Sequence, residues 1–284
     1  AAAEELAEGR STAYGTSGEL LLVEFNQRTD EASGGNALLL DKTVREAVTL
    51  CVDRETLALT GFGGAMPAYG ISVPYGTVGS AAAVCSAESA AAILESAGYT
   101  DADGDGVRES PEGESLSFRI LCSDSSTAWV RAANLLKDMC APAGIALEIT
   151  VLSPDRALAA AEAGDFDLFL TASQSDYDAY LSLASFYWND GNGAFWNGAA
   201  SPGWNISGYA NSEFDALYEE LTFASSAGRD ALEREMEDMV LTGCAALPIA
   251  FAAKNQACSG AWLGLRADHG AGLFFTPAIL RQQL

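Results

Sequence analysis

The middle of the chain alternates short apolar runs with helical patterns, and only a few residues connect one to the next. The apolar runs cover 116–122, 145–152 and 166–173, and the helical patterns between them cover 126–144 and 153–164. An order of strand, helix, strand, helix, strand with such short connections predicts a parallel sheet with right-handed crossovers. Ligands of such sheets collect beyond the carboxyl ends of the strands, so the segment after Ser173 is the first candidate for a binding site.

Further elements are expected on both sides of this unit. The patterns predict strands at 19–26 and 246–253, and helices at 41–62, 86–98, 211–225 and 228–244. Asp41 is the expected N-cap of the first helix, with Thr43 and Glu46 as a rival capping box, and Gly98 is a good C-terminal stop for the second. The chain therefore predicts an α/β fold, with a parallel-rich mixed sheet and helices on both faces.

The charge balance excludes some classes of partner. The 284 residues include 39 Asp and Glu against 15 Lys and Arg, a formal net charge of -24. Such a surface repels nucleic acid and anionic lipid and tolerates cationic or zwitterionic ligands, so no nucleic-acid partner is expected. The sequence has no apolar run of about 18 residues, the length that a membrane span needs. Its first ten residues lack the basic and apolar regions of a signal peptide, so none is expected in this chain.

The cysteine pattern argues against a structural zinc site. No two of the six cysteines are spaced as CxxC, and the single histidine is His269. The cysteines are Cys51, Cys85, Cys122, Cys140, Cys244 and Cys258. Their even number permits three disulfides, whose pairing the sequence does not determine. Cys51 and Cys140 lie in apolar helical patterns that are typical of buried thiols.

Catalytic motifs are absent from the sequence. It contains no recognisable nucleophile elbow, no GxxxxGK[ST] loop and no GxGxxG after a strand. Asp176 and Asp178, two positions apart, leave open a carbohydrate-active enzyme with an acid and a base. Without a nucleophile and a base in reach of each other, we predict a protein that is not an enzyme and needs no cofactor.

An acidic segment at 97–113 has the spacing of a calcium loop. The oxygen ligands would come from Asp101, Asp103, Asp105, Glu109 and Glu112, with Gly106 at the sixth position. A calcium loop of this type leads into a helix, whereas here Pro111 and Gly113 precede a strand. Asp and Gly also suit a tight surface turn. We therefore favour a structural turn and keep a calcium-binding module as the alternative.

Six segments, in order along the chain, resemble the extracytoplasmic solute-binding proteins of ABC importers, in the oligopeptide, dipeptide and nickel class known as family 5. The segments are "EFN" at 24–26, "DKTVREAVTLCVDRETL" at 41–57, "AAAILESAGYTDADGDGVRE" at 90–109, "GDFDLFL" with "DYDAY" within 164–180, "GYANSEFDALYEEL" at 208–221 and "LPIAF" at 247–251. The resemblance implies a periplasmic-binding-protein type II-like lobe.

The family's proteins are nearly twice as long, so the resemblance implies the C-terminal lobe only. Residues 1–26 would then be the end of the missing first lobe and the hinge strand. Residues 27–253 would form the C-terminal ligand-binding lobe, and residues 254–284 would return toward the first lobe. The chain's partners would include that N-terminal lobe of the same protein.

The resemblance also implies a ligand site. The first Asp of the family's turn, which pairs with a peptide's α-ammonium group, corresponds to Asp176. Tyr177, Asp178, Tyr180, Trp188 and Trp196 would contribute to the same site, with other aromatic residues of 186–204 in the core or along the cleft. Two positions depart from the family pattern: the Pro after the second Asp is missing, and Ser173 replaces a Trp. Both indicate a different or larger ligand.

The implied function is that of the substrate-binding component of an ABC transporter, which captures peptides or similar small solutes by hinge closure. Its partners would be the ligand and the ABC permease subunits. The full-length protein would be extracytoplasmic, either periplasmic or anchored as a lipoprotein. Nickel chelates, opines and sugars remain alternative ligands.

Overall fold

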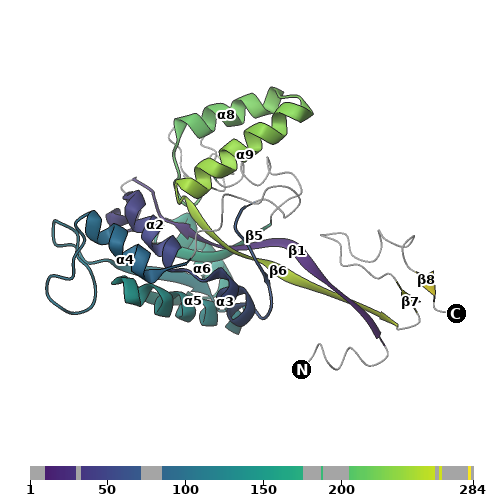
Figure 1. Cartoon of the computed structure of the whole chain (residues 1–284), viewed down its shortest axis with the longest axis horizontal. Helices are drawn as coiled ribbons and strands as arrows, with labels where there is room; N and C mark the ends of the chain where they lie inside the picture. The colour runs from purple at the N-terminus through teal and green to yellow at the C-terminus, as the bar shows by residue number, and fades with distance from the viewer. Residues whose placement is uncertain are drawn as a thin grey trace.

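The protein folds around one mixed sheet of six strands in the order β2-β6-β1-β5-β3-β4 (Figure 1). The computed structural model describes residues 10–29, 33–71, 85–174, 187, 205–259, 262–263 and 281–282. The six strands are β1 (Arg10–Phe25), β2 (Met66–Pro67), β3 (Ser117–Ser123), β4 (Ala146–Leu152), β5 (Leu168–Gln174) and β6 (Ala246–Ser259). A separate antiparallel pair joins β7 (Trp262–Leu263) and β8 (Arg281–Gln282).

The predicted strand–helix–strand–helix–strand unit is confirmed. β3 pairs in parallel with both β4 and β5. The crossovers contain α5 (Thr127–Cys140), which is followed by the short helix η3 (Ala141–Ala143), and α6 (Pro154–Glu162). Pro154 opens α6 at its first helical position, where the missing N–H costs no hydrogen bond.

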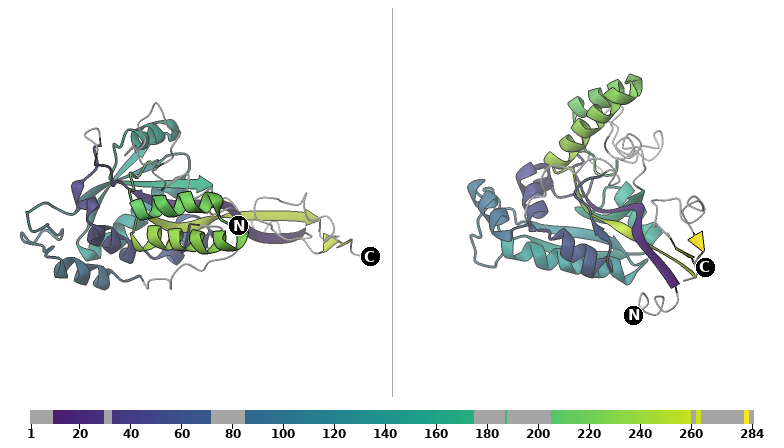
Figure 2. Two further views of the ribbon diagram at one scale, coloured as in Figure 1. Left: turned by 90° about the horizontal axis from the view of Figure 1, so that it is seen from above. Right: turned by 45° about the vertical axis from the view of Figure 1, so that its right-hand side comes forward.

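The other half of the sheet is antiparallel. β1 pairs antiparallel with β5 over Glu19–Phe25 and with β6 along most of its length. Beyond Glu19, β1 and β6 continue as a two-stranded ribbon in which Arg10–Thr16 faces Ala253–Ser259. Figures 1 and 2 show this ribbon running well past the other strands. Both strands are thus longer than the sequence predicts, because pairing between two distant segments extends them.

Alternating side chains of β1 divide the core between the two faces of the sheet. Leu21, Val23 and Phe25 pack in the larger cluster, which α2 (Lys42–Cys51), α4 (Ala87–Ser96) and α5 cover. Leu20 and Leu22 pack on the opposite face beneath α8 (Ser212–Phe223) and α9 (Ser226–Thr242). Helix α6 covers this second face at β3 and β5. The predicted helices on both faces are therefore present.

One helix differs from the sequence prediction. The expected helix over 41–62 ends at Cys51, and Val52 is extended with ψ 112°. Asp53 then caps α3 (Arg54–Thr56) by accepting a hydrogen bond from the Thr56 backbone N–H, and a π-helix, η2 (Leu57–Gly61), follows. An Asp that can cap a new helix start competes with continuation, and here it interrupts an otherwise periodic pattern.

The predicted start of α2 at Asp41 and the predicted stop of α4 at Gly98 are both confirmed. Asp41 caps α2, with its Oδ1 accepting a 2.8 Å hydrogen bond from the Thr43 N–H and its Oδ2 accepting from the Tyr99 hydroxyl. Gly98, with φ of +93°, ends α4 in a conformation that favours glycine. A further short helix, η1 (Ala37–Leu40), precedes α2.

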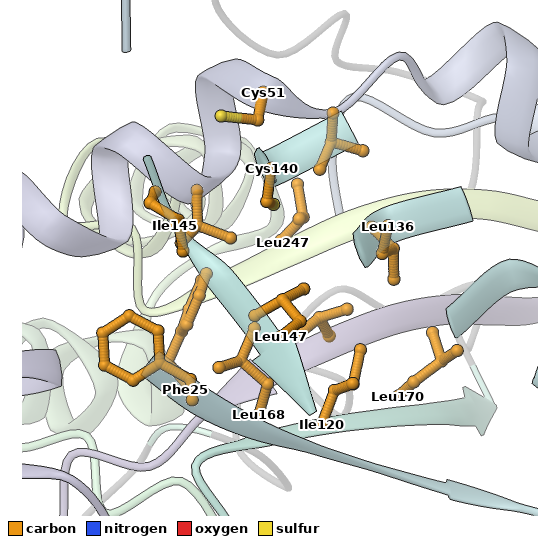
Figure 3. Packing of buried hydrophobic residues seen from close by; sticks show 14 of the residues in the cluster. Phe25, Cys51, Ile120, Leu136, Cys140, Ile145, Leu147, Leu168, Leu170 and Leu247 are labelled. Carbon is orange, nitrogen blue, oxygen red and sulfur yellow. The ribbon is translucent and has the colours of Figure 1, made fainter. Parts of the chain in front are cut away.

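Cys51 and Cys140 are buried free thiols, as the sequence predicts. Both lie in the larger cluster with residues of the sheet, among them Ile145, Leu147 and Leu247 (Figure 3). Of the other described cysteines, Cys122 and Cys244 are buried and Cys85 is exposed, all without a disulfide. In the part of the chain that the structure describes, no helix has the length and apolarity to cross a membrane.

Candidate functional site

The predicted ligand-binding segment follows directly after β5. Gln174, the last residue of β5, pairs with Glu19 of β1. This is the end of the sheet at which β1 and β6 leave as the ribbon. The candidate residues Asp176, Tyr177, Asp178, Tyr180, Trp188 and Trp196 lie outside the described residues. The structure thus gives the strand that leads into the candidate site, while the roles of these six side chains stay predictions.

Two residues of the family-like motifs fix the start of this strand. Asn26, from "EFN", donates hydrogen bonds through Nδ2 to the Gly164 and Phe166 carbonyls, at 2.9 Å and 2.8 Å. Asp167, from "GDFDLFL", accepts from the backbone N–H groups of Asn36 at 2.8 Å and Arg119 at 2.6 Å. Asn26 and Asp167 are both buried. The two motifs therefore act structurally, by tying β1, β3 and the loop before η1 to the base of β5.

Tyr187 is the one aromatic residue of the predicted cleft region that the structure describes, and it belongs to the core. It is fully buried. Its ring makes edge-to-face contacts with Tyr209 and Phe214, with centroids 5.8 Å and 6.4 Å apart. Such contacts stabilise aromatic clusters beyond their buried area. Tyr187 thus packs in the core against Tyr209 and the α8 residue Phe214.

A buried carboxyl group lies next to Tyr187, on the same face of β1 as Leu20 and Leu22. Glu24 is 5% exposed, and its Oε1 accepts a long hydrogen bond of 3.5 Å from the Tyr187 hydroxyl. Its Oε2 has no partner among the described residues. Burial raises the pKa of Glu24 to about 8, which the Tyr187 hydrogen bond only partly opposes. Glu24 is not among the residues predicted from the sequence, although its position two residues after Leu22 in a strand pattern could have indicated burial.

The acidic turn brings together four of the five residues of the calcium alternative. Carboxylate oxygens of Asp101, Asp103, Asp105 and Glu109 lie within 4.8 Å of one another, whereas Glu112 is outside the group. After the turn the chain forms a short antiparallel bridge between Glu109 and Ser115 instead of a helix. The calcium alternative with its five ligands stays a prediction.

These carboxylates already accept hydrogen bonds within the turn. Asp101 accepts from the Gly104 and Gly106 N–H groups, and Glu109 accepts from the Ala102 N–H at 2.8 Å. Gly104 and Gly106 have φ of +81° and +93°, in the region that favours glycine. The N–H groups of Ala102, Gly104 and Gly106 thus have local carboxylate acceptors, which fits the structural turn that the sequence favours.

Comparison with known proteins identifies the family. The model of the bacterial extracellular solute-binding proteins, family 5 Middle, matches residues 1–195. An uncharacterized lipoprotein of Mycobacterium tuberculosis, Rv2585c, is 26% identical over 234 residues, which are 77% of this chain and 38% of that protein. The chain therefore spans well under half the length of this curated relative.

Solved structures show the same fold. The oligopeptide-binding protein AppA from Bacillus subtilis, in complex with a nonapeptide, has a TM-score of 0.76 at 16% identity, over 99% of this chain and 54% of that one. NikA from Brucella suis, in complex with Fe(III)-EDTA, has a TM-score of 0.75 at 17% identity, over 98% of this chain and 54% of that one. These neighbours are binding proteins with the mixed α/β architecture expected of a type II periplasmic-binding-protein lobe. From its sequence match and this architecture, the chain belongs to the bacterial extracellular solute-binding proteins of family 5.

Proposed function

We propose that this chain is the C-terminal lobe of an ABC importer's substrate-binding component, which captures peptides or similar small solutes by closing against a second lobe. The observation that carries the proposal is that two features occur at the same end of the sheet. β5 ends there, just before the candidate segment in the sequence, and β1 and β6 leave the sheet there as the ribbon. A ribbon that connects two lobes would act as the hinge, and a ligand at the end of β5 would lie in the cleft that the hinge closes.

The same ribbon supports the proposed division of the chain. Residues 1–26 and 254–284 would connect to the other lobe, because the ribbon pairs Arg10–Thr16 with Ala253–Ser259, which fall in these segments apart from Ala253. Residues 27–253 would form the ligand-binding lobe. The coverage of only about half of AppA and NikA supports a partner lobe of similar size.

Peptides are the proposed ligand class. Asp176 would pair with a ligand ammonium group, and Tyr177, Asp178, Tyr180, Trp188 and Trp196 would form the surrounding wall. An ion pair in a closed cleft gains strength as water leaves. The nonapeptide complex of AppA supports this class, whereas the Fe(III)-EDTA complex of NikA supports the metal-chelate alternative. The lipoprotein relatives support an extracytoplasmic, membrane-anchored protein that delivers its ligand to ABC permease subunits.

The test is peptide binding to the full-length protein that carries this chain, measured by isothermal titration calorimetry. We expect Asp176→Asn to weaken binding of a free peptide by about tenfold or more, the loss of a charge-assisted hydrogen bond. N-acetylation of the peptide removes the ammonium group, so the variant and the wild type should bind the acetylated peptide equally. Asp138→Asn, on the exposed surface of α5, is the matched control.

Two results would contradict the proposal. If Asp176→Asn and Asp138→Asn bind the free peptide alike, Asp176 does not contact the ammonium group. If peptides of two to nine residues give no heat while a metal chelate or a sugar does, the ligand class is wrong even though the solute-binding role remains.

A further inference from the structure

A pocket of about 520 Å³ lies between the start of α2 and the end of α9, a volume within the usual range of small-molecule sites. Its described lining includes Lys42, Arg45, Tyr209, Asn211 and Gly243 among twelve residues that are otherwise neutral. Two of these residues are cationic and none is acidic, in a chain whose net charge is -24. Figure 1 shows the end of α9 near α2, the two elements that contribute Met239, Thr242, Lys42 and Arg45 to the lining.

The described lining of the pocket contains no residue of the candidate ligand segment. It lies beyond the carboxyl end of β1, and Phe25 at that end pairs with Leu168, the first residue of β5. The candidate ligand segment follows Gln174, at the other end of β5. The pocket therefore lies at the opposite end of β5 from Gln174, the residue that precedes the candidate segment in the sequence.

Arg45 contributes a buried cation whose charge no described carboxylate pairs. It is 7% exposed, and its guanidinium donates to four backbone carbonyls: Nε to Cys244, Nη1 to Leu39 and Leu40, and Nη2 to Gly243. A guanidinium has five N–H bonds, so one is left over. No described ion pair involves Arg45. Neutral carbonyls satisfy donors but do not cancel a charge, and a buried uncompensated charge is unfavourable.

Asp41 is the described carboxylate whose charge acts on Arg45, but the two residues form no described ion pair. Burial has the largest effect on the pKa of Arg45 and lowers it. Cys244 and, to a smaller extent, Asp41 raise this pKa. The Asp41 oxygens accept hydrogen bonds from Thr43 and Tyr99, and Asp41 is not among the described lining residues. The cation thus faces the pocket without a paired anion in the described chain.

Two further lining residues, Tyr209 and Lys42, have donor hydrogens that no described acceptor takes. The Tyr209 hydroxyl, on a side chain that is 6% exposed, accepts a 3.1 Å hydrogen bond from Asn211 Nδ2, and no described acceptor takes its own hydrogen. Lys42 is exposed and makes no ion pair with a described residue. Lys42 and Arg45 both lie in the first turn of α2, where the helix dipole disfavours cations. The stability of α2 therefore does not explain why cations occupy these two positions.

We propose that this pocket binds an oxyanion, the phosphate or carboxylate group of a ligand, through Lys42, Arg45 and Tyr209. The ammonium group, the remaining guanidinium N–H and the phenolic O–H are the spare donors, and an oxyanion supplies the negative charge and the acceptors that they lack. The ligand is distinct from the solute proposed for the cleft.

The test is a titration of the 284-residue chain with inorganic phosphate and, separately, with succinate. Sodium chloride keeps the ionic strength constant. Binding is measured by isothermal titration calorimetry and by NMR chemical-shift changes. We expect saturable binding of at least one anion. Lys42→Ala and Tyr209→Phe should each weaken it by about tenfold, the effect of one hydrogen bond to a charged group. Lys42→Ala removes a cation from a helix N-terminus, so it should leave the fold intact.

Lys137→Ala, an exposed lysine on α5, is the matched control and should bind like the wild type. Vesicles of phosphatidylglycerol, compared with phosphatidylcholine, distinguish the source of the phosphate. If the wild type co-sediments with the anionic vesicles and Lys42→Ala does not, the ligand is a lipid headgroup. If the wild type binds phosphate saturably but does not co-sediment with the vesicles, the ligand is soluble. The proposal is overturned if neither anion binds saturably, or if Lys42→Ala and Lys137→Ala weaken binding equally.

Discussion

Glu24 should make the stability of this fold depend on pH in a direction opposite to that of a paired carboxylate. Its pKa rises from 4.5 to about 8 because burial disfavours the charged form. The folded state therefore holds a proton that the unfolded state has released between these two pH values. Ionisation of Glu24 therefore imposes a free-energy penalty on the folded state relative to the unfolded state. This penalty is absent below pH 4.5, grows as the pH rises, and is complete above pH 8.

The size of the effect follows from the pKa difference. Each pKa unit corresponds to about 1.4 kcal/mol, so the penalty is about 3 kcal/mol at pH 7 and about 5 kcal/mol above pH 8. Glu24→Gln keeps the size and the contact with Tyr187 but cannot ionise. The free energy of unfolding of the variant, relative to that of the wild type, should therefore rise by about 3 kcal/mol between pH 4.5 and pH 7.

The assay is urea unfolding followed by circular dichroism at pH 4.5, 7.0 and 8.5, for the wild type, Glu24→Gln and the control Glu148→Gln. Glu148 is exposed on the edge strand β4. The control should follow the wild type at every pH. Parallel pH curves for Glu24→Gln and the wild type would refute the reasoning, because Glu24 would then titrate alike in both states.

Three further outcomes are expected. Among the described thiols, Cys85 should react first with iodoacetamide, and the four buried ones only after denaturant is added; mass spectrometry that finds equal labelling would contradict the burial. Asp167→Ala should lower the free energy of unfolding by about 1–3 kcal/mol, because two part-buried N–H groups lose their acceptor, and a loss in urea unfolding below about 0.5 kcal/mol would argue against this role. Calorimetric titration with calcium to about 1 mM should show no saturable binding at the acidic turn, whereas binding that Asp103→Ala abolishes would establish the calcium alternative.

Local patterns in the sequence were sufficient for the parallel unit. The crossovers through α5 and α6, the Asp41 cap and the Gly98 stop depend on residues within a few positions of one another, so periodicity and capping chemistry predict them. The family assignment likewise came from short segments in order. The same local reasoning failed at Val52, because a helical period does not show that Asp53 will start a new helix.

Contacts between distant segments were decided only by the tertiary structure. The length of the ribbon depends on β1 meeting β6 more than two hundred positions later, and Arg45 finds its carbonyls at Gly243 and Cys244. The burial of Glu24 depends in the same way on Tyr187. A residue type and its neighbours in sequence determine which local structure is favourable, but the burial of a charge depends on which segments pack over it, and that is set only when the chain folds.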